Sequence, residues 1–188
     1  MNDKILNAIN KAKEYQLNRI GPTNLDRVIK YIEGQKNVDI KVNFFDFSKY
    51  KFNKAGSLIT SFKEEANEPR KILIGVNDNI DKKKQRFSLA HELGHLLLGH
   101  LKLDDPEAFN ISLHIDYNLT KLDDTTSEEN QANAFAQELL MPEDLFVELD
   151  KKYFPEELAE YFKVSEAAIA ARRDNLPWIK RFRDEKEA

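Results

Sequence analysis

Three of the four histidines in this 188-residue sequence lie within ten consecutive positions, in the stretch FSLAHELGHLLLGH. His91 and His95 are four residues apart, and on an α-helix this spacing places both side chains on one face. Two imidazoles on one face can bind the same metal ion. Glu92 lies about 100° around the helix from His91, close enough to reach a water on the metal without ligating it. The motif therefore predicts metal-assisted hydrolysis with Glu92 as the general base.

His100 is one candidate for the third protein ligand. It follows His95 by five residues, which places it off the ligand face of an unbroken helix. An extended three-histidine motif would need its third histidine at the position of Leu101. We therefore interpret His100 as a helix cap or as a hydrogen-bond partner of a ligand. His100, His114 and Tyr117 are also candidates for stabilising an oxyanion, and spacing favours none of them.

A glutamate from a second helix is the alternative third ligand. The segment SEENQANAFAQELLMP predicts such a helix and offers Glu128 and Glu129. Asn133 lies one turn after Glu129 on the same face, where its amide oxygen can accept the ring N–H of a ligating histidine. Glu128 has only Ala132 in the equivalent place. These residues favour Glu129 and leave Glu128 open. Three protein ligands would leave a fourth position for water, as in catalytic zinc sites.

The composition limits both the metal chemistry and the class of protein. No cysteine is present, so a metal ion must be bound by imidazole and carboxylate groups. The 29 basic and 33 acidic residues give a net charge of -4, which provides no general attraction to nucleic acid.

The segment MNDKILNAINKAKEYQ carries charges throughout and is not a signal peptide. No apolar run approaches the roughly 20 residues that span a bilayer, so we expect a cytoplasmic protein without a membrane partner.

Two hydrophobic periods along the chain predict an α+β fold. A helical period predicts helices over residues 4–17, 24–34, 81–101 and 128–140. Alternation predicts strands over residues 38–44, 57–62 and 71–77. The expected core is a small mixed or antiparallel sheet with the histidine-bearing helix packed on it. Residues 103–126 show neither period, and a connection of this length is often a lid or a binding loop.

We expect two units along the chain: a domain over residues 1–142 and a helical subdomain over residues 143–188. The second unit is predicted to contain short helices, with a break at Pro177. Residues 157–173 imitate a helix-turn-helix. However, the second helix would begin with Glu166-Ala167-Ala168, where DNA-binding helices present polar or basic side chains. Direct DNA binding is therefore not expected.

The strand predicted over residues 71–77 is the candidate for holding a peptide substrate. If it lies at an edge of the sheet, its backbone groups around Ile74, Gly75 and Val76 can pair with an extended peptide. Gly75 would then allow a close backbone approach. An ordinary edge strand with a bulge fits the same residues.

The two-part motif RFSLAHELGHLLLGH and ENQANAFAQELLMP resembles the ImmA/IrrE family of metallopeptidases, over roughly residues 72–176. The resemblance implies a zincin-like fold with one zinc ion per chain. It further implies that His91, His95 and Glu129 are the zinc ligands and that Glu92 is the catalytic base. Members of this family cleave and inactivate helix-turn-helix repressors that govern mobile elements or stress responses. The expected function is thus a zinc endopeptidase with such a repressor as its protein substrate.

Two other functions are compatible with a metal site. One is a zinc-bound but catalytically silent module that sequesters a repressor, and the other is a DNA-binding regulator in which the metal stabilises the fold. The presence of Glu92 argues against the first, because binding alone does not require a base. The acidic balance argues against the second. The chain ends soon after the helical tail, so any trigger is expected to act through the catalytic domain, a partner or metal supply.

Overall fold

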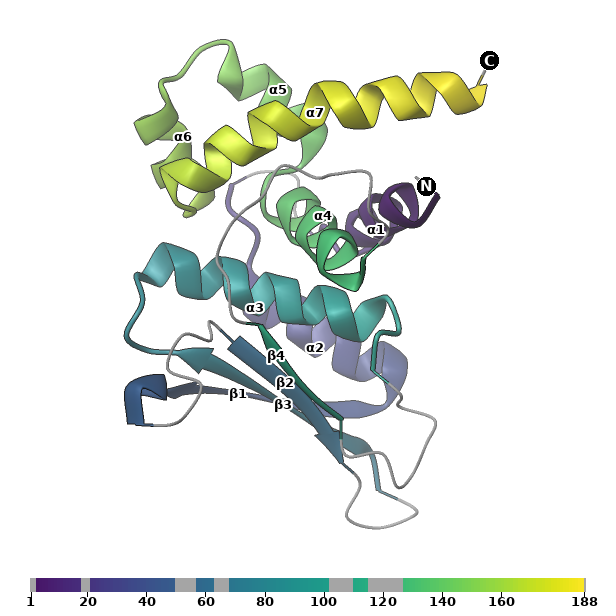
Figure 1. Ribbon diagram of the computed structural model, residues 1–188, viewed down its shortest axis with the longest axis vertical. Coiled ribbons are helices and arrows are strands. Elements are labelled where there is room, and N and C mark those ends of the chain that lie inside the picture. Colours follow the sequence, from purple (N-terminus) through teal and green to yellow (C-terminus); the bar gives the residue numbers. More distant parts are fainter. Residues whose placement is uncertain are drawn as a thin grey trace.

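The computed structural model describes residues 3–17, 21–49, 57–62, 68–101, 110–114 and 127–187. Three strands precede the helix that carries the histidine motif, and one short strand follows it (Figure 1). In chain order the elements are α1 Asp3–Glu14, α2 Leu25–Lys36, β1 Val38–Phe45, the 3-10 turn η1 Phe47–Lys49, β2 Ser57–Phe62, β3 Arg70–Asn77, α3 Lys82–Leu97, β4 Asn110–His114, α4 Glu128–Leu140, α5 Glu143–Asp150, α6 Pro155–Phe162 and α7 Glu166–Glu187.

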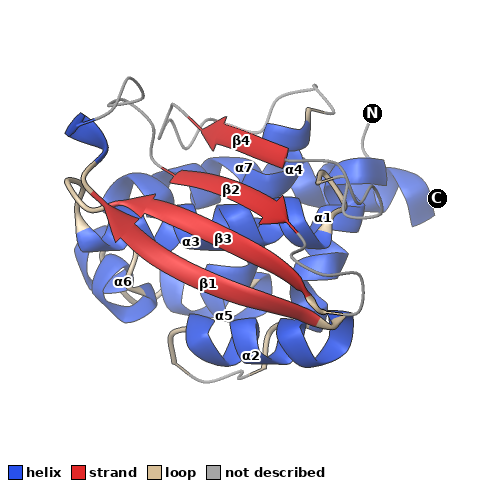
Figure 2. Ribbon diagram, turned by 90° about the horizontal axis from the view of Figure 1, so that it is seen from below, coloured by secondary structure: helices blue, strands red, loops and turns tan. Residues whose placement is uncertain are grey.

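The four strands form one mixed sheet in the order β1-β3-β2-β4 (Figure 2). β1 runs parallel to β3, and β2 runs antiparallel to both β3 and β4. The register pairs Ile40 with Ile72 and Ile59 with Ile74, so these buried side chains share one face of the sheet. The predicted α+β fold with a small mixed sheet is confirmed. β4 corrects the expectation that residues 103–126 contain no regular structure.

Helices cover one face of the sheet in successive layers (Figure 1). α2 packs on β1, and α3 packs on β2 and β3. α4 packs on the side of α3 that faces away from the sheet, α1 packs on α4, and α5 to α7 lie beyond them. In the part of the chain that the structure describes, no helix has the length and apolar character needed to cross a membrane.

β3 lies in the interior of the sheet, so the prediction that its backbone pairs with a substrate peptide is wrong. It pairs with β1 along one side and with β2 along the other. Ile74 and Val76 are fully buried, and a Cβ added at Gly75 would lie 3.0 Å from Leu58 Cγ and 3.2 Å from the Phe45 ring. Gly75 therefore makes room for neighbouring side chains. Within the described residues, the edges of the sheet are β1 and β4.

α3 and α4 approach each other closely at Gly94. A Cβ added there would lie 3.1 Å from the Phe135 ring, 3.2 Å from Ala132 Cα and 3.3 Å from the Ala132 carbonyl oxygen. The helices reach this separation because one contributes glycine and the other alanine. This contact sets how far the side chains of α4 stand from those of α3.

Gly94→Ala should be less stable than Gly34→Ala by about 1–3 kcal/mol, the usual cost of overpacking a core. Both glycines lie inside helices, so both variants lose the same flexibility in the unfolded chain. Nothing lies within 4 Å of a Cβ added at Gly34, whereas at Gly94 the backbone of Ala132 must move. Urea unfolding of the two variants measures the difference. Equal stabilities would mean that α3 and α4 are not in close contact at Gly94.

α7 continues through Pro177, which corrects the prediction of a helix break there. Proline removes one helical hydrogen bond, but Ile169 and Ile179 are buried on either side of it and hold both halves of the helix against the core. The fully buried Arg172 also forms an ion pair with Glu138 of α4. One buried apolar cluster includes residues from both halves of the chain. The division into residues 1–142 and 143–188 stays a prediction.

Candidate metal centre

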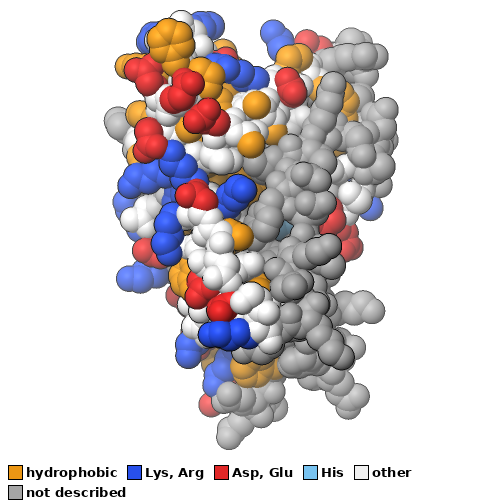
Figure 3. Space-filling model, turned by 60° about the vertical axis from the view of Figure 1, so that its left-hand side comes forward, with side chains coloured by type: hydrophobic (Ala, Val, Ile, Leu, Met, Phe, Trp, Pro, Cys, Tyr) orange, Lys and Arg blue, Asp and Glu red, His pale blue; other side chains and the backbone are white. Residues whose placement is uncertain are grey.

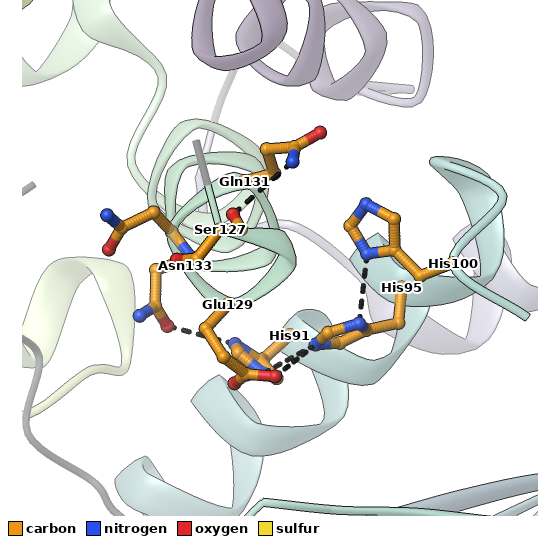
Figure 4. A network of polar contacts seen from close by, with 8 residues as sticks. His91, His95, His100, Ser127, Glu129, Gln131 and Asn133 are labelled. Carbon is orange, nitrogen blue, oxygen red and sulfur yellow. Dashed lines mark hydrogen bonds and ion pairs between the residues drawn. The ribbon is translucent and has the colours of Figure 1, made fainter. Parts of the chain in front are cut away.

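His91 and His95 project from the same face of α3 (Figure 4). The helix begins after Asp81, whose carboxylate accepts a hydrogen bond of 2.8 Å from the Lys83 backbone N–H. Both histidines are almost fully buried, with exposed fractions of 7% and 2%. Their Nε2 atoms lie 3.0 Å apart. The four-residue spacing thus directs one nitrogen of each ring to the same point.

Glu129 reaches this point from the first turn of α4. Ser127 caps that helix: its hydroxyl oxygen accepts a hydrogen bond of 3.2 Å from the backbone N–H three residues later. The Glu129 carboxylate oxygens lie 3.3 Å from His91 Nε2 and 3.5 Å from His95 Nε2. Among the described residues, these three side chains form a group that could hold a metal ion, and Glu128 is not part of it.

Each of the two histidine rings makes a hydrogen bond on the side that faces away from Glu129, and this bond fixes the tautomer of His91. His91 Nδ1 lies 2.9 Å from Asn133 Oδ1, the contact that the spacing of Glu129 and Asn133 predicts. An amide oxygen only accepts, so His91 carries its proton on Nδ1 and leaves the Nε2 lone pair free to bind a metal. His95 Nδ1 lies 2.9 Å from His100 Nδ1. If His95 likewise binds through Nε2, its Nδ1–H donates and His100 accepts.

The position of His100 depends on the turn that ends α3. Gly99 has a φ of 77°, in the left-handed region that glycine adopts without strain, and this residue reverses the chain after Leu98. The next residue is thereby carried back to the side of His95. Burial lowers the pKa of His100, opposed by the charge of Glu128 and a hydrogen bond with Gln131. A neutral ring is the form that can accept the proton of His95 Nδ1.

The donor set fits zinc. Zinc–nitrogen and zinc–oxygen bonds of about 2.0–2.1 Å in a tetrahedron place neighbouring ligand atoms about 3.3 Å apart. The three separations measured here are 3.0, 3.3 and 3.5 Å. Two imidazole lone pairs and a carboxylate this close together repel one another, and a cation between them removes that repulsion. His91, His95 and Glu129 would hold such an ion as its protein ligands.

Glu92, the predicted base, is fully buried in α3 and follows His91 directly. Of the candidates for stabilising an oxyanion, His114 belongs to β4, although its side chain lies outside the described part of the structure. Tyr117 lies outside the described residues altogether.

Gln131 is a member of the site that sequence reasoning missed. It lies on α4, is buried, and forms a side-chain hydrogen bond with His100. The sequence gives little indication of this role. Gln131 follows Glu129 by two positions, and residues two apart on an α-helix lie on different faces. Its contact depends on the turn at Gly99 and is therefore not visible in the spacing along α4.

Comparison with known proteins agrees with this geometry. The family described as the IrrE N-terminal-like domain of peptidase family M78 matches residues 35–173 of the sequence. The matched region covers most of the chain and includes every residue of the metal centre. The chain belongs to this family. The matched range runs through α6 and into α7.

Two relatives of this IrrE N-terminal-like domain are radiation response metalloproteases IrrE. The one from Deinococcus radiodurans is 30% identical over 112 residues, covering 58% of this chain and 32% of the relative. The one from Deinococcus deserti is 32% identical over 93 residues, covering 50% of this chain and 31% of the relative. The chain thus spans about a third of the length of these relatives.

A solved structure shows a similar fold. It is a Mycobacterium tuberculosis transcriptional regulator, which superimposes with a TM-score of 0.54 at 15% sequence identity. The similarity covers 94% of this chain and 48% of the regulator. It therefore includes both the sheet and the C-terminal helices.

Asn133→Ala should lower zinc affinity by about 10- to 100-fold, as is typical when a hydrogen-bond partner of a metal-bound histidine is removed. Without the amide oxygen, His91 loses the contact that holds its ring and tautomer. Asn79→Ala is the matched control, because Asn79 bonds Asp46 away from the metal centre. Competition with a chromophoric chelator measures both affinities. Equal zinc affinities in the two variants would show that Asn133 does not contribute to zinc binding.

Proposed function

We propose that this chain is a zinc-dependent endopeptidase. The observation that carries the proposal is the convergence of His91, His95 and Glu129 from two helices, with Glu92 buried beside them. A binding module would need the metal ligands alone, whereas hydrolysis also needs a base. The family and the names of the Deinococcus relatives support a metalloprotease.

Each side chain has a distinct role in the proposed reaction. A bound zinc ion would supply Lewis acidity, polarising the scissile carbonyl and acidifying a water molecule. Glu92 takes the proton of the attacking water and passes it to the departing amine nitrogen. Asn133 and His100 hold the two histidine rings in the required tautomers.

We further propose that the substrate is a helix-turn-helix repressor, the class that the resemblance to the ImmA/IrrE family implies. An extended segment of that repressor would pair with β4, because β3 has no open edge. In Figure 2, β4 and α4 lie toward one edge of the molecule, whereas β1 and α2 lie toward the opposite edge. A peptide along β4 would therefore run on the side from which Glu129 reaches the site.

The experiment is incubation of the purified chain with the repressor encoded nearest to its gene, with zinc and after removal of zinc by a chelator. Zinc-dependent cleavage at one or a few peptide bonds is the expected result. An unrelated folded protein is the control and should stay intact. Formation of a stable complex without cleavage would instead support the silent anti-repressor module and contradict the proposed peptidase.

A further inference from the structure

A cavity of about 500 Å³ lies at the start of α3, away from the metal centre. It is formed where four segments meet: the entry and first turn of α2, the end of β1, the first turns of α3, and the turn between α6 and α7. Its volume falls within the range of small-molecule sites, about 300–1,000 Å³. None of its lining residues belongs to the metal centre.

Positive charge dominates the lining of this cavity. Lys82, Arg86 and Lys163 line it together with a single carboxylate, that of Asp26, which leaves two positive charges in excess. In contrast to Lys83, which pairs with Glu160, none of these four forms an ion pair within the described structure. Figure 3 turns this side of the molecule forward and shows basic side chains gathered below the C-terminal helices.

Arg86 is the most constrained of the three cations. Its guanidinium donates a hydrogen bond to the Thr23 carbonyl oxygen at the entry of α2, which fixes the group at the wall of the cavity. Burial lowers the pKa of Arg86, and the charge of Asp26 opposes this effect. A partly desolvated cation that feels a nearby carboxylate, but forms no ion pair with it among the described residues, is stabilised further when an anion binds next to it.

Backbone features add to the positive potential. The first turn of α2 lines the cavity, and the N-terminal end of a helix carries a partial positive charge. Lys163 has a φ of 55°, a left-handed conformation at the C-cap of α6 that favours glycine. A lysine at this position introduces backbone strain, and it also adds a positive charge to the cavity.

Apolar side chains form another part of the lining. Phe44 is 53% exposed, which is unusual for a phenylalanine in a sheet, and Lys82 Nζ lies 5.6 Å from the centre of its ring. Leu89 of α3 is partly buried and lines the same space. The cavity thus combines a cluster of cations with an aromatic and aliphatic surface of the kind that contacts a flat ring.

We propose that this cavity binds a phosphorylated small molecule of mononucleotide size. Its phosphate contacts Lys82, Arg86 and Lys163, and its ring packs against Phe44 and Leu89. The site is independent of the peptidase proposal, because it shares no residue with the metal centre. The cavity is lined by residues of α2, β1 and α3 on one side and by Lys163, in the turn between α6 and α7, on the other. A bound ligand would therefore link these two parts of the chain.

Titration calorimetry with AMP, adenosine and inorganic phosphate tests the proposal on the full chain. AMP should bind with a Kd below about 1 mM, and adenosine and phosphate should each bind at least about tenfold more weakly. Absence of AMP binding would overturn the proposal. Adenosine binding as tightly as AMP would exclude phosphate recognition, and phosphate binding as tightly as AMP would exclude a contribution from the apolar wall.

Two variants at exposed positions locate the site without disturbing the core. Lys82→Gln should weaken AMP binding by about tenfold, whereas Lys84→Gln, on the same helix but outside the cavity, should leave it unchanged.

Lys163→Gly should also weaken AMP binding by about tenfold, while raising the melting temperature of the free protein because glycine relieves the strain. If Lys163 were merely structural, only the melting temperature would change. Full AMP binding by Lys82→Gln and Lys163→Gly would place the ligand elsewhere, such as at the metal centre, and would overturn the proposal.

Discussion

Glu92→Gln should keep its zinc and lose at least about 10²-fold in turnover, the usual contribution of a general base. Glutamine has nearly the same shape as glutamate, so it can occupy the fully buried position in α3 without opening a cavity. It cannot accept the proton of the attacking water. The ligands His91, His95 and Glu129 are unchanged, and zinc binding should therefore persist.

Zinc analysis and the repressor cleavage assay on one preparation decide this prediction. The melting temperature of the variant serves as the control for folding. Loss of zinc together with activity would mean that Glu92 supports the metal ligands. Full activity with zinc bound would remove Glu92 from the mechanism and leave the proton transfer to another group.

Glu129→Ala should reduce zinc affinity by more than the 10- to 100-fold that is typical of changes outside the ligand set. The variant retains only two protein donors, His91 and His95, where a zinc site of this kind uses three. Glu128→Ala is the matched control, since Glu128 is the preceding residue, is also exposed, and stands outside the cluster. Its zinc affinity should stay within the range of changes outside the ligand set.

The comparison also tests the alternative ligand that the sequence suggests. His100→Ala should lower affinity only moderately, because His100 contacts the Nδ1 side of His95 and not the metal-facing side. An empty site in His100→Ala, with zinc retained in Glu129→Ala, would show that the third ligand comes from the turn after α3. At a high zinc concentration, the free energies of unfolding of these variants should rank as their zinc affinities do, because ligand binding stabilises the folded state by mass action. Glu129→Ala should therefore be the variant that zinc stabilises least.

Much of the metal centre follows from local geometry and is therefore visible in the sequence. The i, i+4 spacing of His91 and His95 requires only that their segment be helical. Glu129 and Asn133 obey the same rule on a second helix, and the structure places the first near both histidine rings and the second against His91. The caps at Ser127 and Ser165 are equally local, because each hydroxyl bonds an N–H three residues later.

Strand neighbours and chain reversals were decided by the tertiary structure. Alternation along residues 71–77 shows which side chains of β3 are buried, but it contains no information on which strands pair with its backbone. The hydrogen bond between His95 and His100 requires the left-handed turn at Gly99. α7 passes through Pro177 because core contacts on both sides outweigh one lost hydrogen bond. The basic cavity unites Asp26, Lys82 and Lys163, which are distant in the chain, and only packing brings such residues together.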